Sequence, residues 1–399
     1  MSTHSKTLPT PPLALNRNQR VNPNTFQLQY FIQDPSVEIS DSSVSFLETL
    51  SLEGQIENGP KDREIEIFGE SAILDDGIFE IVENLIILST KQVNVLDSMH
   101  TYTVARIVLN MYKRLFKKIM ATDIDSNGES EFDFKERWNG PLKIYPRAYK
   151  DIINSSYTSI DNYIDFGFTD DMAVCRSFDV VAHEVGHAVF QALRYPFGGE
   201  IDPSNDSSEI NEAFADITAI FALLNSQKVC KIIIDQTNGD LRSYKNFIPK
   251  IGEQFAKERD NFETDFIRNL CDVFNHIKEY SNSADPHVSS LLFTGGIYEF
   301  ILRIFNKRRE KTLLEFSHEI LELNNELANQ LCEIVKNVSL VVTTAFYNER
   351  ESINISLNIL GIAIRSVLET NNSIDEYYLP IFNSIFAEFN QFNQNETPQ

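Results

Sequence analysis

The segment SFDVVAHEVGHAVFQAL, residues 177–193, decides how this chain is interpreted. Its apolar residues recur at helical spacing, and the helix that they predict carries His183, Glu184 and His187. Positions i and i+4 lie one turn apart on one helix face, so both imidazoles can reach the same metal ion. Glu184 points about 100° around the helix from His183, where it can contact a metal-activated water as a general base. The pattern therefore predicts a catalytic zinc site.

The competing interpretation is a chance HExxH pattern whose histidines are satisfied core residues. The chain has only 7 histidines, so a random match is rare. A glutamate between two histidines, flanked by VVA and AVF, would also leave polar groups without partners beside an apolar helix face. Metal binding gives these groups a partner, and we therefore favour it. Ser177, with Asp179 in the first turn, is expected to cap the start of this helix.

Two histidines do not complete a zinc site, so the third ligand must come from elsewhere in the chain. The next predicted helix, SSEINEAFADITAIFALL at 207–224, carries Asn211, Glu212 and Asp216. Glu212 and Asp216 share one helix face, which suits one carboxylate on the metal and another that accepts the second N–H of a ligating imidazole. Asn211 is a candidate acceptor for the other histidine. The alternative is that these acidic residues form a solvated helix face.

The two helices together resemble the signature of the thermolysin-like gluzincin peptidases, HExxH followed by a glutamate in an NExxxD helix. The segments DVVAHEVGHAV and INEAFADI carry this resemblance. It implies that one catalytic zinc ion is bound by His183, His187 and Glu212. It also implies that Asn211 and Asp216 orient the imidazoles, and that the chain is a zinc-dependent endopeptidase acting on a peptide or protein substrate.

The resemblance also implies a mechanism and further site residues. Glu184 would take a proton from the zinc-activated water and later pass it to the leaving amine. The segment ADPHVSSLLFTGGIYEF is similar to the family segment whose histidine stabilises the oxyanion, here His287 with Asp285 as its orienter. NSSYTSIDNYIDFG looks like the edge strand that pairs with substrate, headed by Asn154. GDLRS makes Arg242 the candidate that holds a substrate carbonyl.

Hydrophobic patterning divides the chain into a sheet-containing part and a helical part. The runs FQLQYFI, REIEIFG and FEIVENLIIL indicate short strands, 93–118 indicates one long amphipathic helix, and LKIYPRAY indicates a further strand. The resemblance therefore implies an α+β, two-lobed thermolysin-like fold, with a mixed or antiparallel sheet and the long helix in the N-terminal lobe. We expect a flexible or pro-segment-like extension at 1–45, an N-terminal α+β lobe at 46–200 ending in the HExxH helix, a mainly α-helical C-terminal lobe at 201–390 and a polar tail at 391–399.

The charge of the chain bears on its partners. Its 399 residues include 58 acidic and 35 basic side chains, which give a net charge of −23. This charge repels nucleic acid phosphates and anionic lipid headgroups, so neither is expected as a partner. No apolar stretch approaches the roughly 20 residues of a membrane span, and the first residues lack the pattern of a Sec signal peptide. We expect a cytoplasmic protein or one released by a signal-independent route; its oligomeric state and substrate preference are not determined.

Three features leave alternatives open. The stretch DIDSNGESEFDF begins like an EF-hand, but its twelfth position is Phe134 rather than a bidentate glutamate, so calcium binding stays open beside a solvated acidic turn. The cysteines lack the spacing of a zinc ribbon and are expected to be buried thiols; they are Cys175, Cys230, Cys271 and Cys332. A catalytically silent peptidase-like protein, which binds peptides without cutting them, is the alternative to an enzyme.

Overall fold

The computed structural model describes residues 25–32, 47–53, 56, 60–69, 90–122, 132–170, 172–196, 206–252, 268–271, 273–281, 283–315, 320–352, 355–371 and 373–393. Its α-helices are α1 (Thr90–Thr122), α2 (Phe134–Arg137), α3 (Phe178–Arg194), α4 (Asp206–Leu224), α5 (Gln227–Thr237), α7 (Ile277–Ser281), α8 (Pro286–Ser289), α9 (Leu291–Glu315), α10 (Ile320–Asn348), α11 (Leu357–Thr370) and α12 (Tyr378–Asn393). The strands are β1 (Thr25–Phe31), β2 (Leu47–Glu53), β3 (Ile65–Ile67), β4 (Leu142–Lys150), β5 (Ser155–Thr158), β6 (Tyr163–Phe168), β7 (Lys250–Ile251) and β8 (Arg268–Asn269). The short 3-10 helices are η1 (Val174–Arg176) and η2 (Val273–Asn275). The described chain is thus mixed α and β, compatible with the expected α+β class.

A four-stranded mixed sheet precedes the HExxH helix. Its strand order is β3-β4-β6-β5, with β3 and β6 parallel to β4 and β5 antiparallel to β6. Strand β5 therefore stands at one edge, but the stretch NSSYTSIDNYIDFG, expected to be the edge strand, forms two strands, of which β6 lies inside the sheet between β4 and β5. Strands β1 and β2 pair separately as an antiparallel ribbon. The strand expected at FEIVENLIIL lies outside the described residues.

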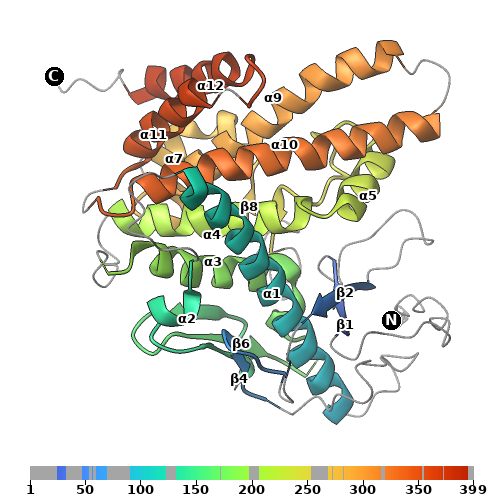
Figure 1. Ribbon diagram of the computed structural model, residues 1–399, viewed down its shortest axis with the longest axis vertical. Helices are drawn as coiled ribbons and strands as arrows, with labels where there is room; N and C mark the ends of the chain where they lie inside the picture. The colour runs from blue at the N-terminus through green and yellow to red at the C-terminus, as the bar shows by residue number, and fades with distance from the viewer. Residues whose placement is uncertain are drawn as a thin grey trace, which may run out of the picture.

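The long helix expected at 93–118 is present and extends over Thr90–Thr122 as α1. Figure 1 shows it crossing the molecule diagonally, from beside the sheet to the helices of the C-terminal part. One side is fully buried at positions such as Val104, Val108 and Phe116, because it packs against α3, α4 and α10. The hydroxyls of Tyr112 and Thr218 lie 2.7 Å apart and form a hydrogen bond that joins α1 to α4.

Helices α3 and α4 lie between the sheet and the C-terminal helices (Figure 1). The part of the chain after α3 is mainly helical, as expected, and α9 to α12 form the layer farthest from β4 and β6. The helical pattern did not anticipate the ribbon of β7 and β8, which pair antiparallel through two residues each. Strands this short are below the length at which residue alternation can be recognised.

One helical stretch of the described residues, Pro286–Leu314, is long and apolar enough to cross a membrane. This differs from the expectation that no stretch approaches that length. However, 83% of its most apolar window is buried inside the protein, as in the core helix of a folded domain. A second candidate arises only if α4 and α5 are counted together, although they are bent by 86°.

Several expectations concern residues that the structure does not describe or describes differently. The acidic stretch at 123–131, most of the extension at 1–45 and the tail from residue 394 lie outside the described residues. The four cysteines are free thiols, and three are buried as expected, namely Cys175, Cys230 and Cys332. Cys271 is only partly buried, which corrects the expectation for that residue.

Candidate metal centre

The start of α3 is anchored by an acidic side chain. Ser177 stands at the N-cap position, but its side chain makes no capping hydrogen bond, and its hydroxyl donates to Asp179 instead. The other carboxylate oxygen of Asp179 accepts a hydrogen bond of 2.8 Å from the backbone N–H of Gly252, which follows β7. Asp179 therefore joins the beginning of the HExxH helix to the β7 region, in addition to its favourable position near the helix dipole.

A glycine allows α3 and α4 to approach closely. A Cβ built on Gly186 would lie 2.8 Å from the Cα of Ala215 and 3.0 Å from the Cβ of Thr218. Neither distance is compatible with ordinary carbon contacts, which are about 3.5–4.0 Å. Because Gly186 lies between the two histidines of the motif, this close approach brings α4 to the helix segment that carries the imidazoles.

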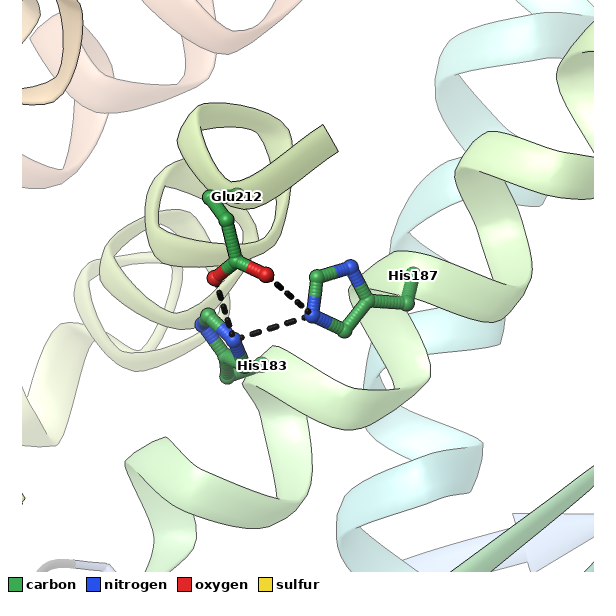
Figure 2. A group of neighbouring side chains, drawn as sticks. All are labelled: His183, His187 and Glu212. Carbon is green, nitrogen blue, oxygen red and sulfur yellow. Dashed lines mark hydrogen bonds and ion pairs between the residues drawn. The ribbon is translucent and has the colours of Figure 1, made fainter. Parts of the chain in front are cut away.

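The three predicted ligands converge (Figure 2). The Nε2 atoms of His183 and His187 lie 3.0 Å apart, and the two carboxylate oxygens of Glu212 lie 3.3 Å from His183 Nε2 and 3.5 Å from His187 Nε2. One donor atom from each residue lies within 4.8 Å of the others, which defines a group that could hold a metal ion. Ligand atoms around a tetrahedral zinc ion, each about 2.0–2.2 Å from the metal, are themselves separated by about 3.3 Å. The observed spacings match this value.

The hydrogen bonding of the cluster also fits a metal. Asp216, which is fully buried, lies with its Oδ1 2.9 Å from His183 Nδ1, so the expected contact between this carboxylate and a ligating imidazole is present. An ionised carboxylate only accepts, so in the neutral imidazole Nδ1 carries the proton and Nε2 keeps its lone pair. Glu212 Oε2 is buried without a hydrogen-bond partner, although it faces the imidazoles. The Nε2 atoms of the two imidazoles and the Glu212 carboxylate therefore face one another at distances that a single metal ion could bridge.

The electrostatics of the cluster favour a positive charge. Burial lowers the pKa of His183, but the carboxylates of Asp216 and Glu212 outweigh it and raise this pKa to about 10. Burial raises the pKa of Glu212, but the imidazoles of His187, His183 and His287 outweigh it and hold this pKa well below its usual range. A proton or a divalent cation can supply the charge that the carboxylates favour.

Asn211 and His187 are not brought together. Asn211 Oδ1 and His187 Nδ1 are both buried without a hydrogen-bond partner, so the expected contact between them is absent. Asn211 directly precedes Glu212, and successive helical residues point about 100° apart. Asn211 and Glu212 therefore project in different directions from α4, and the structure shows no hydrogen bond from His187 to the Asn211 amide oxygen.

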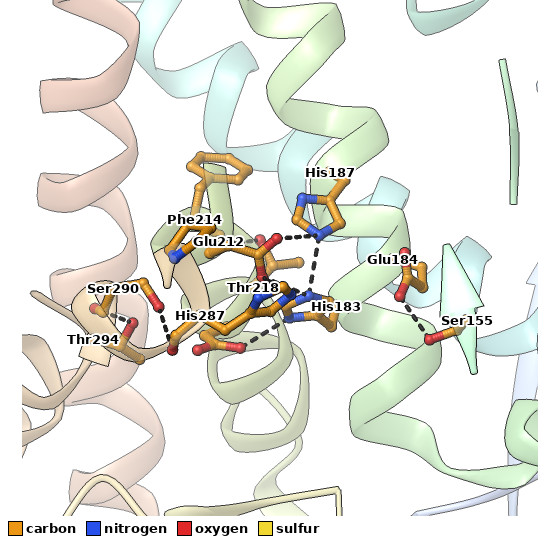
Figure 3. A network of polar contacts seen from close by, with 12 residues as sticks. Ser155, His183, Glu184, His187, Glu212, Phe214, Thr218, His287, Ser290 and Thr294 are labelled. Atoms are coloured by element: carbon orange, nitrogen blue, oxygen red, sulfur yellow. Dashed lines mark hydrogen bonds and ion pairs between the residues drawn. The ribbon is translucent and has the colours of Figure 1, made fainter. Parts of the chain in front are cut away.

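The candidate general base has a partner that the sequence interpretation missed. Glu184 is buried, and its Oε1 accepts a hydrogen bond of 2.7 Å from the hydroxyl of Ser155 on the edge strand β5 (Figure 3). The strand pattern identified the edge strand, but not which of its residues faces α3. Only the packing of β5 against α3 makes this contact visible.

His287 approaches the cluster from a third direction (Figure 3). Asp285 is the N-cap of α8, and its Oδ1 accepts from the backbone N–H of His287 at 2.9 Å and lies 3.0 Å from His287 Nδ1. The expected contact between Asp285 and His287 is therefore present. The other ring nitrogen, Nε2, lies 3.5 Å from Glu212 Oε2. The His287 imidazole therefore lies beside the three candidate metal ligands but is not one of them.

Two further residues, Asn154 and Arg242, were predicted to bind substrate. Asn154 directly precedes β5, and its carbonyl accepts a hydrogen bond of 2.8 Å from the N–H of Gly167 in β6, so it heads the edge strand as expected. Arg242 forms an ion pair with Glu299 on α9. The guanidinium of Arg242 is therefore engaged by a carboxylate on α9, and among the described residues it makes no ion pair with the three candidate ligands.

Comparison of the chain with protein-family models, curated proteins and solved structures finds no match. The interpretation of the site therefore depends on its own geometry and chemistry.

Proposed function

We propose that this chain is a zinc-dependent endopeptidase. The observation that carries the proposal is the convergence of His183, His187 and Glu212, with donor atoms within 4.8 Å of one another. Two imidazoles and one carboxylate form the ligand set of catalytic zinc sites, in which a fourth position stays open for water or substrate. Glu184, adjacent in sequence to the first ligand, supplies the acid/base group that hydrolysis requires.

The arrangement of the surrounding elements supports the more specific proposal of a thermolysin-like, two-lobed fold. The mixed sheet with its edge strand β5 precedes the HExxH helix, and a mainly helical region follows it. A substrate backbone would add to the outer edge of β5, beside which no strand of the described residues pairs, and this is a general mode of peptide recognition. Since β5 packs against α3, a peptide bound along this strand would run beside the metal ligands.

The residues of the site divide the work of peptide hydrolysis among them. His183, His187 and Glu212 would hold the zinc ion, which when bound acts as a Lewis acid that activates water and polarises the scissile carbonyl. Glu184 would accept the proton of the attacking water and donate it to the leaving amine. His287, with Nδ1 held by Asp285, would direct its Nε2 toward the oxygen that gains charge in the transition state.

The test compares the purified wild-type protein with Glu184→Gln. The glutamine variant keeps the shape of the side chain and all three predicted ligands but cannot accept a proton. We expect both proteins to bind one zinc ion per chain, measured by elemental analysis. We expect the wild type to cleave casein or a quenched fluorescent peptide, and the variant to be slower by roughly 10²- to 10⁴-fold, the usual contribution of a general base. Removal of zinc by a chelator should abolish wild-type cleavage, and added zinc should restore it.

Glu322, an exposed residue in the first turn of α10, provides the matched control. Glu322→Gln makes the same chemical change away from the site and should leave cleavage unchanged. A wild-type protein that binds zinc and peptide without chelator-sensitive cleavage would instead be the catalytically silent peptide-binding protein. Cleavage retained by Glu184→Gln would remove Glu184 from its role as the base.

A further inference from the structure

The hydrogen bond from the Ser155 hydroxyl to Glu184 has no role in the proposed mechanism as described so far. The hydroxyl donates to Glu184 Oε1 across 2.7 Å, between the edge strand of the sheet and the HExxH helix. Figure 3 shows Ser155 on its strand facing Glu184 from the side opposite the metal ligands. A carboxylate has two oxygens, so this bond engages one of them and leaves the other for a proton in transit.

The strand geometry makes this contact specific to Ser155. Successive residues of a strand point to opposite faces, so Ser155 and its neighbour Ser156 cannot face the same helix. Ser156 indeed donates to Asp165 Oδ1 at 2.8 Å, its direct partner on β6. Ser155 pairs in register with Phe166, and this pairing fixes the position of its hydroxyl relative to the sheet. The chain therefore carries two adjacent serines, of which one reaches the candidate base.

We propose that Ser155 is a positioning residue that holds the Glu184 carboxylate in one orientation against β5. This inference rests on the proposed function, because it assigns to Ser155 a role in that reaction. A glutamate side chain has three rotatable bonds and many accessible rotamers, and a hydrogen bond to a charged oxygen selects among them. Since a peptide substrate would bind along β5, the same strand fixes the position of both the scissile bond and the base.

The experiment compares Ser155→Ala, Ser155→Thr and Ser156→Ala with the wild type, all loaded with zinc. Loss of orientation acts on the chemical step, so we expect Ser155→Ala to lower kcat by roughly 10- to 100-fold with KM changed less than about twofold. Ser155→Thr retains a hydroxyl at the same position and should recover kcat to within about threefold of the wild type. Ser156→Ala removes the neighbouring hydroxyl, which bonds Asp165 rather than Glu184, so any effect through substrate binding along β5 should appear in KM rather than in kcat. Zinc content should be the same in all four proteins.

A readout independent of activity accompanies the kinetics. In crystal structures of the zinc-loaded proteins, we expect one orientation of Glu184 in the wild type and in Ser155→Thr, and a displaced or multiple orientation in Ser155→Ala. A kcat in Ser155→Ala equal to that of the wild type would overturn the inference. So would a loss of kcat in Ser155→Ala that also occurs in Ser155→Thr and in Ser156→Ala. An unchanged Glu184 in the crystal structure of Ser155→Ala would do the same.

Failure of the inference can be distinguished from failure of the proposed function. If the wild type cleaves peptides and Ser155→Ala cleaves them equally well, only the role of Ser155 is lost. If the wild type binds zinc but cleaves no peptide, the endopeptidase proposal is lost, and the crystallographic comparison still decides whether Ser155 orients Glu184.

Discussion

Replacing Gly186 with alanine perturbs the metal centre without changing any ligand. The new Cβ would lie 2.8 Å from Ala215 Cα, an atom of the α4 backbone that no side-chain rotation can move. Carbon atoms rest about 3.5–4.0 Å apart, so α3 and α4 would have to separate by roughly 0.7–1.2 Å. Metal sites tolerate deviations of only about 0.2 Å in their ligand distances. We therefore expect Gly186→Ala to bind zinc at least about 10-fold more weakly than the wild type.

The effect on stability is smaller, because two contributions oppose each other. Overpacking costs roughly 1–3 kcal/mol, whereas alanine is more favourable than glycine inside a helix by about 1 kcal/mol. Zinc affinity is measured by competition with a chromophoric chelator, and stability by urea unfolding of the zinc-free protein. Gly361→Ala in α11 is the matched control, since its new Cβ would meet the ring of Phe386 and no metal-bearing helix. Wild-type zinc affinity in Gly186→Ala would refute the argument that this close approach assembles the site.

Two further predictions concern buried polar groups. Asp216→Asn keeps the size of the side chain but removes the negative charge that faces His183 Nδ1. We therefore expect zinc affinity to fall roughly 10- to 100-fold in the same competition assay. An unchanged affinity would contradict the orienting role of Asp216. Burial lowers the pKa of His100 from its usual 6.5 to about 3, so its contribution to stability is complete above pH 6.5 and is lost as the pH falls toward 3. Between pH 6 and 5, urea unfolding of the wild type should lose about 1 kcal/mol per pH unit more than that of His100→Asn, and equal slopes would contradict this.

The parts of the fold and site that could be predicted depend on short-range patterns. The HExxH helix, the following acidic helix and the long α1 each show their periodicity within one segment, and their positions follow from the sequence. Asp216 could be found because it lies one turn after Glu212 on the same helix face. Asp285 could be found because it lies two residues before His287, within reach of both the backbone and the ring.

The parts that could not be predicted depend on contacts between distant segments. Ser155 and Glu184 meet only because the edge strand packs on α3, and nothing in either segment indicates this. The close approach at Gly186 depends in the same way on which residues of α4 lie opposite it. Arg242 was assigned by resemblance alone, and its ion pair with Glu299 on α9 joins residues 57 positions apart, which the loop sequence does not indicate. Asn211 was assigned from its spacing, which does not say which side of α4 faces the imidazoles.

The division of the ligand set between two helices has a consequence for synthesis of the protein. A nascent chain that has emerged only as far as α3 carries both imidazoles of the cluster but not the carboxylate of Glu212. Hydrolytic activity of the proposed kind would arise only after α4 has left the ribosome and packed against α3. If the chain is the proposed enzyme, the order of its segments keeps the ligand set incomplete until α4 has been synthesised and has packed on α3.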